Sequence, residues 1–219
     1  MVTVDVTQDF ICPWCLVGER RLAAAIAGLP DPGAVRVRHL PFELNPDMPP
    51  EGVDRRAYRT AKFGSWDYSQ RLDAQTAAAG APDGIAFAYD RIARTPNTRR
   101  AHRLMALAAE KGLAGELSAA LLSGYFERGL DIGDPEVLAA LAAAAGLDRG
   151  EAERFLAGDD GTDGVLAAEA AVLASGVASV PSFRIGDRVL SGAQPVRVLR
   201  AALLAALEGD DGRTAAAAE

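Results

Sequence analysis

The stretch that decides the fold is VTVDVTQDFICPWC, residues 2–15. Valines alternate with polar residues over its first half, and this period of two predicts a β-strand. Cys12 and Cys15 then mark a change to a helical period, and the predicted helix ends near Gly28. Residues 35–40 alternate again. A strand, a helix and a second strand in this order indicate a β-α-β unit with parallel strands and a right-handed crossover.

The middle of the chain, residues 49–176, carries almost only helical patterns after a loop rich in proline. Capping residues and terminal glycines predict helices over 66–79, 98–111, 135–145, 149–155 and 162–175. Their spacing follows no fixed repeat, so a solenoid is not expected. We therefore predict an all-helical domain in this part of the chain.

Strand patterns return after Gly176. Residues 182–185 and 188–191 flank Gly186-Asp187, a two-residue turn of the hairpin type, and a final helix is predicted over 195–207. Without the helical block, the chain is βαβ followed by ββα, which is the order of a thioredoxin fold. The predicted α/β protein has a thioredoxin-like domain from 1–48 and 177–209, an inserted helical domain over 49–176 and a flexible tail over 210–219.

Composition excludes several classes of protein. The 219 residues contain 23 Lys and Arg against 30 Asp and Glu, a formal net charge of −7, so nucleic acid is not an expected partner. No segment approaches the ~20 apolar residues that span a bilayer, and no leader pattern is seen, so we expect a cytoplasmic protein without a membrane partner. A close cysteine pair in that reducing compartment is more typical of catalysis or metal binding than of a structural disulfide.

Cys12 and Cys15 stand where the first predicted strand ends and the first helix begins. The first turn of a helix has unpaired N–H groups and a partial positive charge, which favour the thiolate form of Cys12. Pro13 suits this turn because it has no N–H to satisfy. Cys15 lies one turn later on the same side, so we expect it to be the more buried thiol and to resolve a mixed disulfide on Cys12. Asp9 opposes thiolate formation if it lies close.

A metal site is the main alternative to a redox pair. Zinc would need further ligands at close spacing, but the chain offers only His39 and His102, in separate elements. The pattern of two cysteines beside a βαβ unit therefore favours redox chemistry, and no metal is predicted.

Val180-Pro181 directly precedes the third predicted strand. A proline that starts a strand is typical of an edge or of a cis bond. In a thioredoxin fold, a cis-proline loop faces the two cysteines, and the residue before the proline offers its backbone groups to an extended substrate. We therefore predict a cis Val180–Pro181 bond beside Cys12.

Five groups of residues complete a pattern that spans nearly the whole chain. They are DFICPWC (9–15) with Gly18, LPFELNP (40–46), Asn97-Thr98 with AHRL (101–104), VASVPSF (177–183) and SGAQ (191–194). With these in order, the sequence resembles the DsbA-like thioredoxin-fold oxidoreductases, in particular their cytoplasmic FrnE-like branch.

The resemblance implies a role for each matching residue. Cys12 would be the attacking thiolate, Cys15 the resolving thiol and Pro181 the cis-proline, with Pro13, Trp14 and Val180 in support. His102 and Asn97 become candidates for a substrate groove, although a lone histidine is more often a packing residue. Leu16, Ser182 and Arg184 depart from the family's usual residues, so its partner preference is not carried over.

The predicted function is that of a thiol:disulfide oxidoreductase acting on a protein or a small molecule that contains a thiol or a disulfide. Its centre is the redox-active Cys12–Cys15 pair, with no other cofactor and with glutathione as a candidate co-substrate. The Pro-Trp pair lacks the imidazole of the Pro-His pair found in strong oxidants, which favours a reducing or isomerising role.

Two alternatives stay open. A glutathione-dependent isomerase or transferase of the same fold typically has serine in place of Cys12, so the cysteine argues against it. A redox-sensing or chaperone-like module would use the pair without turnover. An apolar face on the helical domain would allow a homodimer.

Overall fold

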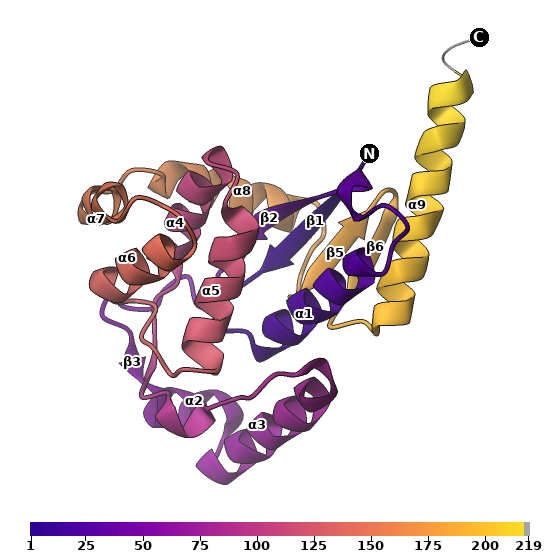
Figure 1. The fold of residues 1–219 in the computed structure, drawn as a ribbon. Coiled ribbons are helices and arrows are strands. Elements are labelled where there is room, and N and C mark those ends of the chain that lie inside the picture. The colour runs from indigo at the N-terminus through magenta and orange to yellow at the C-terminus, as the bar shows by residue number, and fades with distance from the viewer. Residues whose placement is uncertain (217–219) are drawn as a thin grey trace.

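The computed structural model describes residues 1–216 and is built around a four-stranded sheet with the strand order β2-β1-β5-β6 (Figure 1). The strands are β1 (Val2–Gln8), β2 (Val35–Pro41), β5 (Ser182–Ile185) and β6 (Arg188–Ser191). The first strand pairs parallel with β2 and antiparallel with β5, so the two ends of the chain share one sheet. The predicted α/β fold, with a βαβ half and a ββα half, is therefore confirmed.

Helices α1 (Pro13–Ala27) and α9 (Val196–Ala216) lie side by side against this sheet (Figure 1). The alternating valines of β1 are the residues buried beneath them, in a core with Phe183 and Leu199. The last helix continues to Ala216, into the segment 210–219 for which the sequence predicts a flexible tail. Residues 217–219 lie outside the described residues.

The central part of the chain is helical, as predicted, and gathers on the other side of the molecule (Figure 1). Its helices are α2 (Arg55–Phe63), α3 (Trp66–Gly80), α4 (Arg99–Glu110), α5 (Ala114–Phe126), α6 (Pro135–Ala144), α7 (Arg149–Ala157) and α8 (Thr162–Ala174). Two short strands, β3 (Val53–Asp54) and β4 (Arg94–Thr95), pair antiparallel. They join the segment before α2 to the segment before α4. The sequence predicted neither α2 nor α5 as a separate helix.

Several predicted caps are present as side-chain hydrogen bonds. Ser65, Asp134 and Asp148 each accept from a backbone N–H in the first turn of α3, α6 and α7. The Asn97 side chain accepts from the backbone N–H of Arg99 at 2.9 Å. The helix itself begins at Arg99, one residue later than predicted.

The helical part shares its core with the start of α1. One buried cluster contains Phe10, Cys15 and Leu16 together with leucines from α4 and α5, such as Leu104 and Leu117. Helices of the central part thus pack against the cysteine pair. The domain boundaries at 48/49 and 176/177 stay a prediction. No helix within residues 1–216 combines the length and the apolar character that a bilayer span requires.

Candidate active site

Cys12 is the N-cap residue of α1 and has an extended backbone. Its N–H donates to the carbonyl of Asp9 at 3.1 Å, and its own carbonyl accepts from the N–H of Cys15 at 2.9 Å. Pro13 occupies the first turn, which contains no acidic residue. The short turn after β1 therefore holds Cys12 at the positively polarised N-terminal end of the helix.

Cys15 lies deeper than Cys12, with 1% of its surface exposed against 6%. Both are free thiols in this structure. Burial raises the pKa of Cys15 well above its usual value, and the hydrogen bond and the charge of Cys12 raise it further. Both thiols are buried, but they are unequal: Cys15, the deeper one, holds its proton, whereas Cys12 lines a cavity.

The loop before β5 closes over Cys12. The Cys12 thiol donates to the Val180 carbonyl at 3.6 Å, and the Val180–Pro181 peptide bond is cis. The Pro181 carbonyl accepts from the N–H of Gly192 at 2.8 Å, which anchors the loop to the end of β6. The structure therefore brings Cys12, Cys15, Val180 and Pro181 together.

A cavity of about 250 Å³ opens beside Cys12, between the start of α1 and helices α2, α3 and α5. We call it the Cys12 cavity. Its wall is formed by Ile11, Cys12, Pro13, Trp14, Leu44, Arg55, Tyr58, Arg59, Lys62, Phe63, Leu72, Asp73, Gln75, Thr76, Thr95, Tyr125 and Phe126. Trp14 is 39% exposed. A ligand in this cavity would touch the CPWC motif and α2 at once.

Sequence reasoning missed the cationic side of this cavity. Arg55, Arg59 and Lys62 come from α2, which was not predicted. Their spacing of four and three residues places them on one face of a helix, and this pattern was the available signal.

The two candidates for a substrate groove lie elsewhere. His102 is buried, with its Nε2 3.5 Å from Asp9 Oδ1 and its ring centroid 4.9 Å from that of Phe10. Asn97 donates to the carbonyl of Met48 at 2.7 Å and braces the loop before α4. Neither side chain lines the Cys12 cavity. His102 thus lies against Asp9, the residue whose carbonyl accepts from the N–H of Cys12, and against Phe10.

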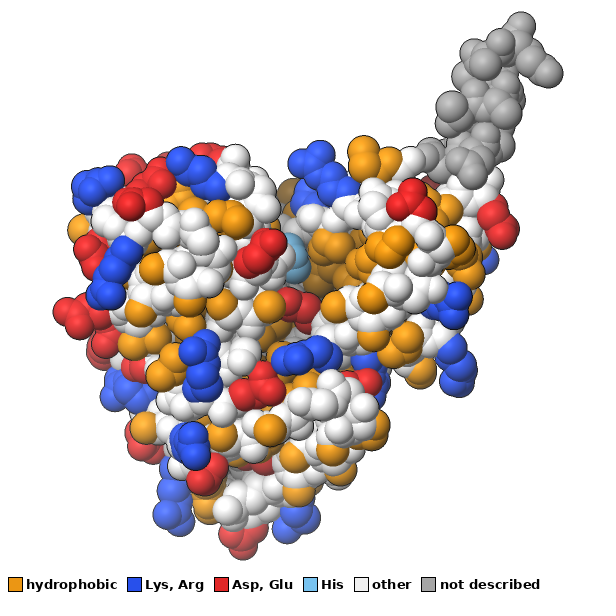
Figure 2. Space-filling model, in the orientation of Figure 1, with side chains coloured by type: hydrophobic (Ala, Val, Ile, Leu, Met, Phe, Trp, Pro, Cys, Tyr) orange, Lys and Arg blue, Asp and Glu red, His pale blue; other side chains and the backbone are white. Residues whose placement is uncertain are grey.

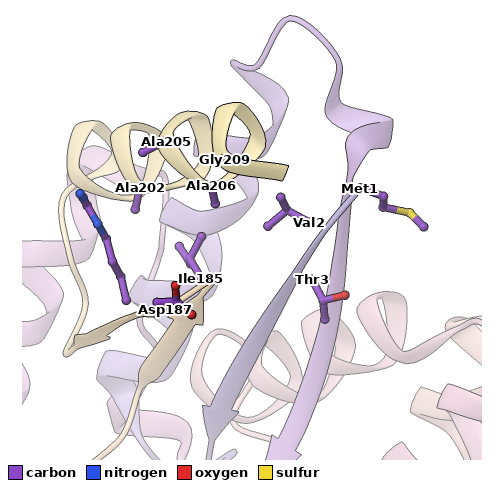
Figure 3. Close-up of a pocket in the computed structure, with 11 residues that line it drawn as sticks. Met1, Val2, Thr3, Ile185, Asp187, Ala202, Ala205, Ala206 and Gly209 are labelled. Atoms are coloured by element: carbon purple, nitrogen blue, oxygen red, sulfur yellow. The ribbon is translucent and has the colours of Figure 1, made fainter. Parts of the chain in front are cut away.

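Two further cavities are present in the described part of the chain. One, of about 270 Å³, lies between β2, α4 and α8 and includes both histidines. Figure 2 shows a hollow with hydrophobic side chains and a histidine at its floor. The other, of about 330 Å³, lies between α9 and the turn of the β5–β6 hairpin (Figure 3). It includes Val2, at the opposite end of β1 from the cysteines, roughly 20 Å along the strand, so it is separate from the thiol site.

No group of three or more His, Cys, Asp or Glu side chains able to hold a metal ion occurs among the described residues.

Comparison with known proteins gives matches over most of the chain. An uncharacterized protein of Bacillus subtilis (strain 168), YwbO, is 28% identical over 193 residues, which are 88% of this chain and 90% of YwbO. The crystal structure of a probable DsbA oxidoreductase, SCO1869 from Streptomyces coelicolor, is 34% identical, with a TM-score of 0.86 and with 95% of this chain and 91% of that chain covered.

A more distant neighbour is the cytosolic disulfide reductase DsbM from Pseudomonas aeruginosa, solved with GSH. It is 20% identical, with a TM-score of 0.64 over 95% of this chain and 98% of that chain, which shows a shared fold. The finer FrnE-like assignment stays a prediction. The model of the DSBA-like thioredoxin domain matches residues 3–204, and the chain therefore belongs to that family of thioredoxin-fold proteins.

Proposed function

We propose that this protein is a thiol:disulfide oxidoreductase in which Cys12 attacks and Cys15 resolves. One observation carries the proposal: the Cys12 thiol sits at the N-terminus of α1 and on the wall of a cavity, while Cys15 is buried one turn behind it. Family membership supports a redox enzyme in general. The roles of the two thiols follow from their unequal exposure.

In the reducing direction, the Cys12 thiolate attacks one sulfur of a substrate disulfide. The substrate S–S bond breaks, one thiol leaves, and a mixed disulfide forms on Cys12. Cys15 then loses its proton and attacks the Cys12 sulfur, which releases the second thiol. The protein ends with a Cys12–Cys15 disulfide, and the two electrons have reduced the substrate. The oxidising direction is the reverse of these steps.

The Val180 carbonyl has a supporting role in this proposal. It accepts a hydrogen bond from the Cys12 thiol in the free protein. Once Cys12 is a thiolate or part of a mixed disulfide, this carbonyl is free to accept a backbone N–H from an extended peptide substrate. Pro181 keeps the carbonyl turned toward the sulfur.

Glutathione is proposed as a candidate co-substrate, because a neighbour of the same fold was solved with it. A reducing role in the cytoplasm is proposed on the same precedent, since that neighbour is named a cytosolic disulfide reductase. The isomerase alternative is less favoured, because both cysteines are present and one of them has the burial of a resolving thiol.

An insulin reduction assay tests the proposal. The wild-type protein should accelerate precipitation of the insulin B chain by dithiothreitol, whereas Cys12→Ser should be inactive and Cys15→Ser should be strongly impaired. A wild-type protein that gives no turnover with insulin or with any small disulfide would refute the oxidoreductase assignment and favour a non-catalytic redox module.

A further inference from the structure

We infer that the preferred substrate is a small disulfide that carries carboxylates, one of which binds against Arg59 and Lys62 in the Cys12 cavity. The inference rests on the proposed thiol–disulfide exchange at Cys12 and names the class of substrate that this site takes. It follows from the charges of the cavity wall, their burial and the size of the cavity.

The wall of the Cys12 cavity has more cations than anions. Arg55, Arg59 and Lys62 face a single carboxylate, Asp73, and the described residues contribute no second carboxylate to the lining. This positive excess occurs in a chain whose formal net charge is −7. Several Lys and Arg side chains also project from the lobe that α2 and α3 form (Figure 2). The site thus attracts anions although the whole protein repels them.

Two of these cations are buried around one anion. The side chains of Arg55 and Arg59 are 5% and 14% exposed, and they donate to the two oxygens of Asp73 at 2.6 and 2.7 Å. One carboxylate therefore serves two guanidinium groups. Burial, the largest cause, lowers the pKa of Arg59, and the nearby Arg55 contributes to the shift. Arg59 also donates to the hydroxyl and the carbonyl of Ser69, so both guanidinium groups have partners. Asp73 nevertheless supplies one negative charge against two positive ones, and the remaining positive charge would stabilise a second anion at this place.

The neighbouring hydroxyl groups do not supply that anion. Burial raises the pKa values of Tyr89 and Tyr125, so both stay neutral at physiological pH. Tyr58 donates to Asn45 Oδ1 at 2.5 Å and accepts from Lys62 Nζ at 2.7 Å. Lys62 itself is exposed and is held at the cavity by this contact. A ligand carboxylate is the group that would complete the charge balance.

The size of the Cys12 cavity favours a small ligand. A volume of about 250 Å³ lies below the range of roughly 300–1,000 Å³ typical of sites for drug-sized molecules. It accommodates one half of a small disulfide with its sulfur at Cys12 and its acid group toward α2. Aromatic side chains such as Phe63 and Phe126 supply the apolar part of the wall.

The reaction is balanced without any further reactant. The reduced protein and one disulfide, RSSR, give the Cys12–Cys15 disulfide and two RSH. The substrate S–S bond breaks, the protein S–S bond forms, and the two thiol protons of the protein end on the released thiols. A single turnover of pre-reduced protein therefore measures the substrate preference directly.

The test compares three symmetric disulfides of similar length and different charge. They are the dianionic 3,3′-dithiodipropionate, the neutral bis(2-hydroxyethyl) disulfide and the dicationic cystamine. Oxidation of pre-reduced protein is followed by acid quench, alkylation and mass spectrometry, and each rate constant is divided by that of a neutral thiol, 1-thioglycerol, with the same disulfide. We expect the normalised rate for the dianion to exceed that for the dication by about tenfold or more, within the range of charge-focusing clefts, and the ratio to fall in high salt.

A matched pair of variants separates the cavity from the net charge. Lys62→Gln and Arg56→Gln each remove one cation from an exposed position on α2, but only Lys62 lines the cavity. The dianion-to-dication ratio should fall several-fold in Lys62→Gln and stay at the wild-type value in Arg56→Gln.

The outcomes distinguish the two levels of the proposal. Equal normalised rates for the three disulfides, or an equal loss of preference in both variants, would overturn the anionic substrate class and leave the exchange reaction standing. Failure of all three disulfides to oxidise the protein would instead refute the exchange reaction itself.

Discussion

The thiol of Cys12 donates to the backbone carbonyl of Val180 at 3.6 Å, across a separation of 168 residues in the chain. The contact follows from the sheet register, in which Val6 of β1 lies opposite Phe183 of β5. Because these strands are antiparallel, the end of β1 meets the start of β5. The reactive sulfur and the backbone that would receive a substrate are therefore positioned by the same pair of strands.

The unequal burial of the two thiols predicts which variant accumulates a trapped intermediate. In Cys15→Ser, Cys12 can still attack a disulfide, but nothing resolves the product, so a mixed disulfide should accumulate. In Cys12→Ser, the remaining Cys15 is 1% exposed and holds its proton, so trapping should be at least tenfold lower. Intact-mass spectrometry after incubation with oxidised substrate measures both. Equal trapping in the two variants would contradict the assigned roles.

Gly18 sets the spacing between α1 and the loop before β5. A Cβ at this position would lie 2.9 Å from Phe183 Cζ and 3.0 Å from Pro181 Cγ, closer than packed atoms tolerate. Gly18→Ala should therefore lower the free energy of unfolding by about 1–3 kcal/mol through overpacking. Because Pro181 must shift, insulin reduction should also slow. Urea unfolding and the insulin assay check the two effects.

Gly115 provides the matched control for Gly18. It lies in the first turn of a helix, α5, and a Cβ there meets no atom within 4 Å. Gly115→Ala should raise the free energy of unfolding by about 0.5–1 kcal/mol, since alanine has the higher helix propensity. If both alanine variants are stabilised, the tight contact at Gly18 does not constrain the fold.

Local patterns predicted much of this fold. The valine alternation of β1 corresponds to its buried face, and the caps at Ser65, Asp134 and Asp148 open helices where expected. Helix α2 was missed because it is short and rich in charged residues, and its buried position is an arginine, Arg55, instead of an apolar residue. Helix α5 was missed for the opposite reason: it is buried on most of its surface, which weakens the helical period.

The sequence predicted the two cysteines of the candidate site but not the cationic side of its cavity. Cys12 and Cys15 are recognisable because their spacing and their place after a strand are local features. The spacing of the α2 cations places them on one helix face, but their position beside Cys12 results from tertiary packing, which no local pattern reports. His102 was a candidate for the groove because of the family resemblance, and the structure turns it toward Asp9.

The negative charge of Asp9 is predicted to raise the pKa of Cys15. Burial is the main cause of the raised pKa of Cys15, and the negative charge of Asp9 adds to the effects of Cys12. Asp9 is fully buried, and its Oδ2 accepts from the N–H of Leu44 at 2.7 Å, a bond that an asparagine oxygen can keep. Asp9→Asn should therefore lower the pKa of Cys15, measured by thiolate absorbance in the Cys12→Ser background.

The control for Asp9→Asn is Asp5→Asn. Asp5 lies on β1, the strand that precedes Asp9, and pairs with the exposed Arg38 at 2.7 Å. Its removal should leave the titration of Cys15 unchanged. A Cys15 titration that is identical in all three proteins would show that the Asp9 charge does not reach the thiol.

Glu19 predicts a pH dependence of stability that a single substitution should remove. Burial raises its pKa from 4.5 to about 7, against the opposing effects of the Ser118 hydroxyl, at 2.7 Å, and of Arg20. The folded protein thus binds this proton more tightly than the unfolded chain does. The resulting stabilisation is complete below about pH 4.5 and is lost as the pH rises through about 7.

Glutamine at position 19 keeps an acceptor for Ser118 but does not titrate. The free energy of unfolding of Glu19→Gln, relative to wild type, should therefore rise on the order of 3 kcal/mol between about pH 4.5 and pH 8. Urea denaturation at several pH values measures this difference. Burial lowers the pKa of His39 to about 4, which gives a stability change of opposite sign in this range, but His39 is present in both proteins and cancels. Glu116→Gln, an exposed change on α5, is the control for the loss of one carboxylate from the chain. A Glu19→Gln difference that stays constant with pH would show that the carboxyl titrates in its ordinary range.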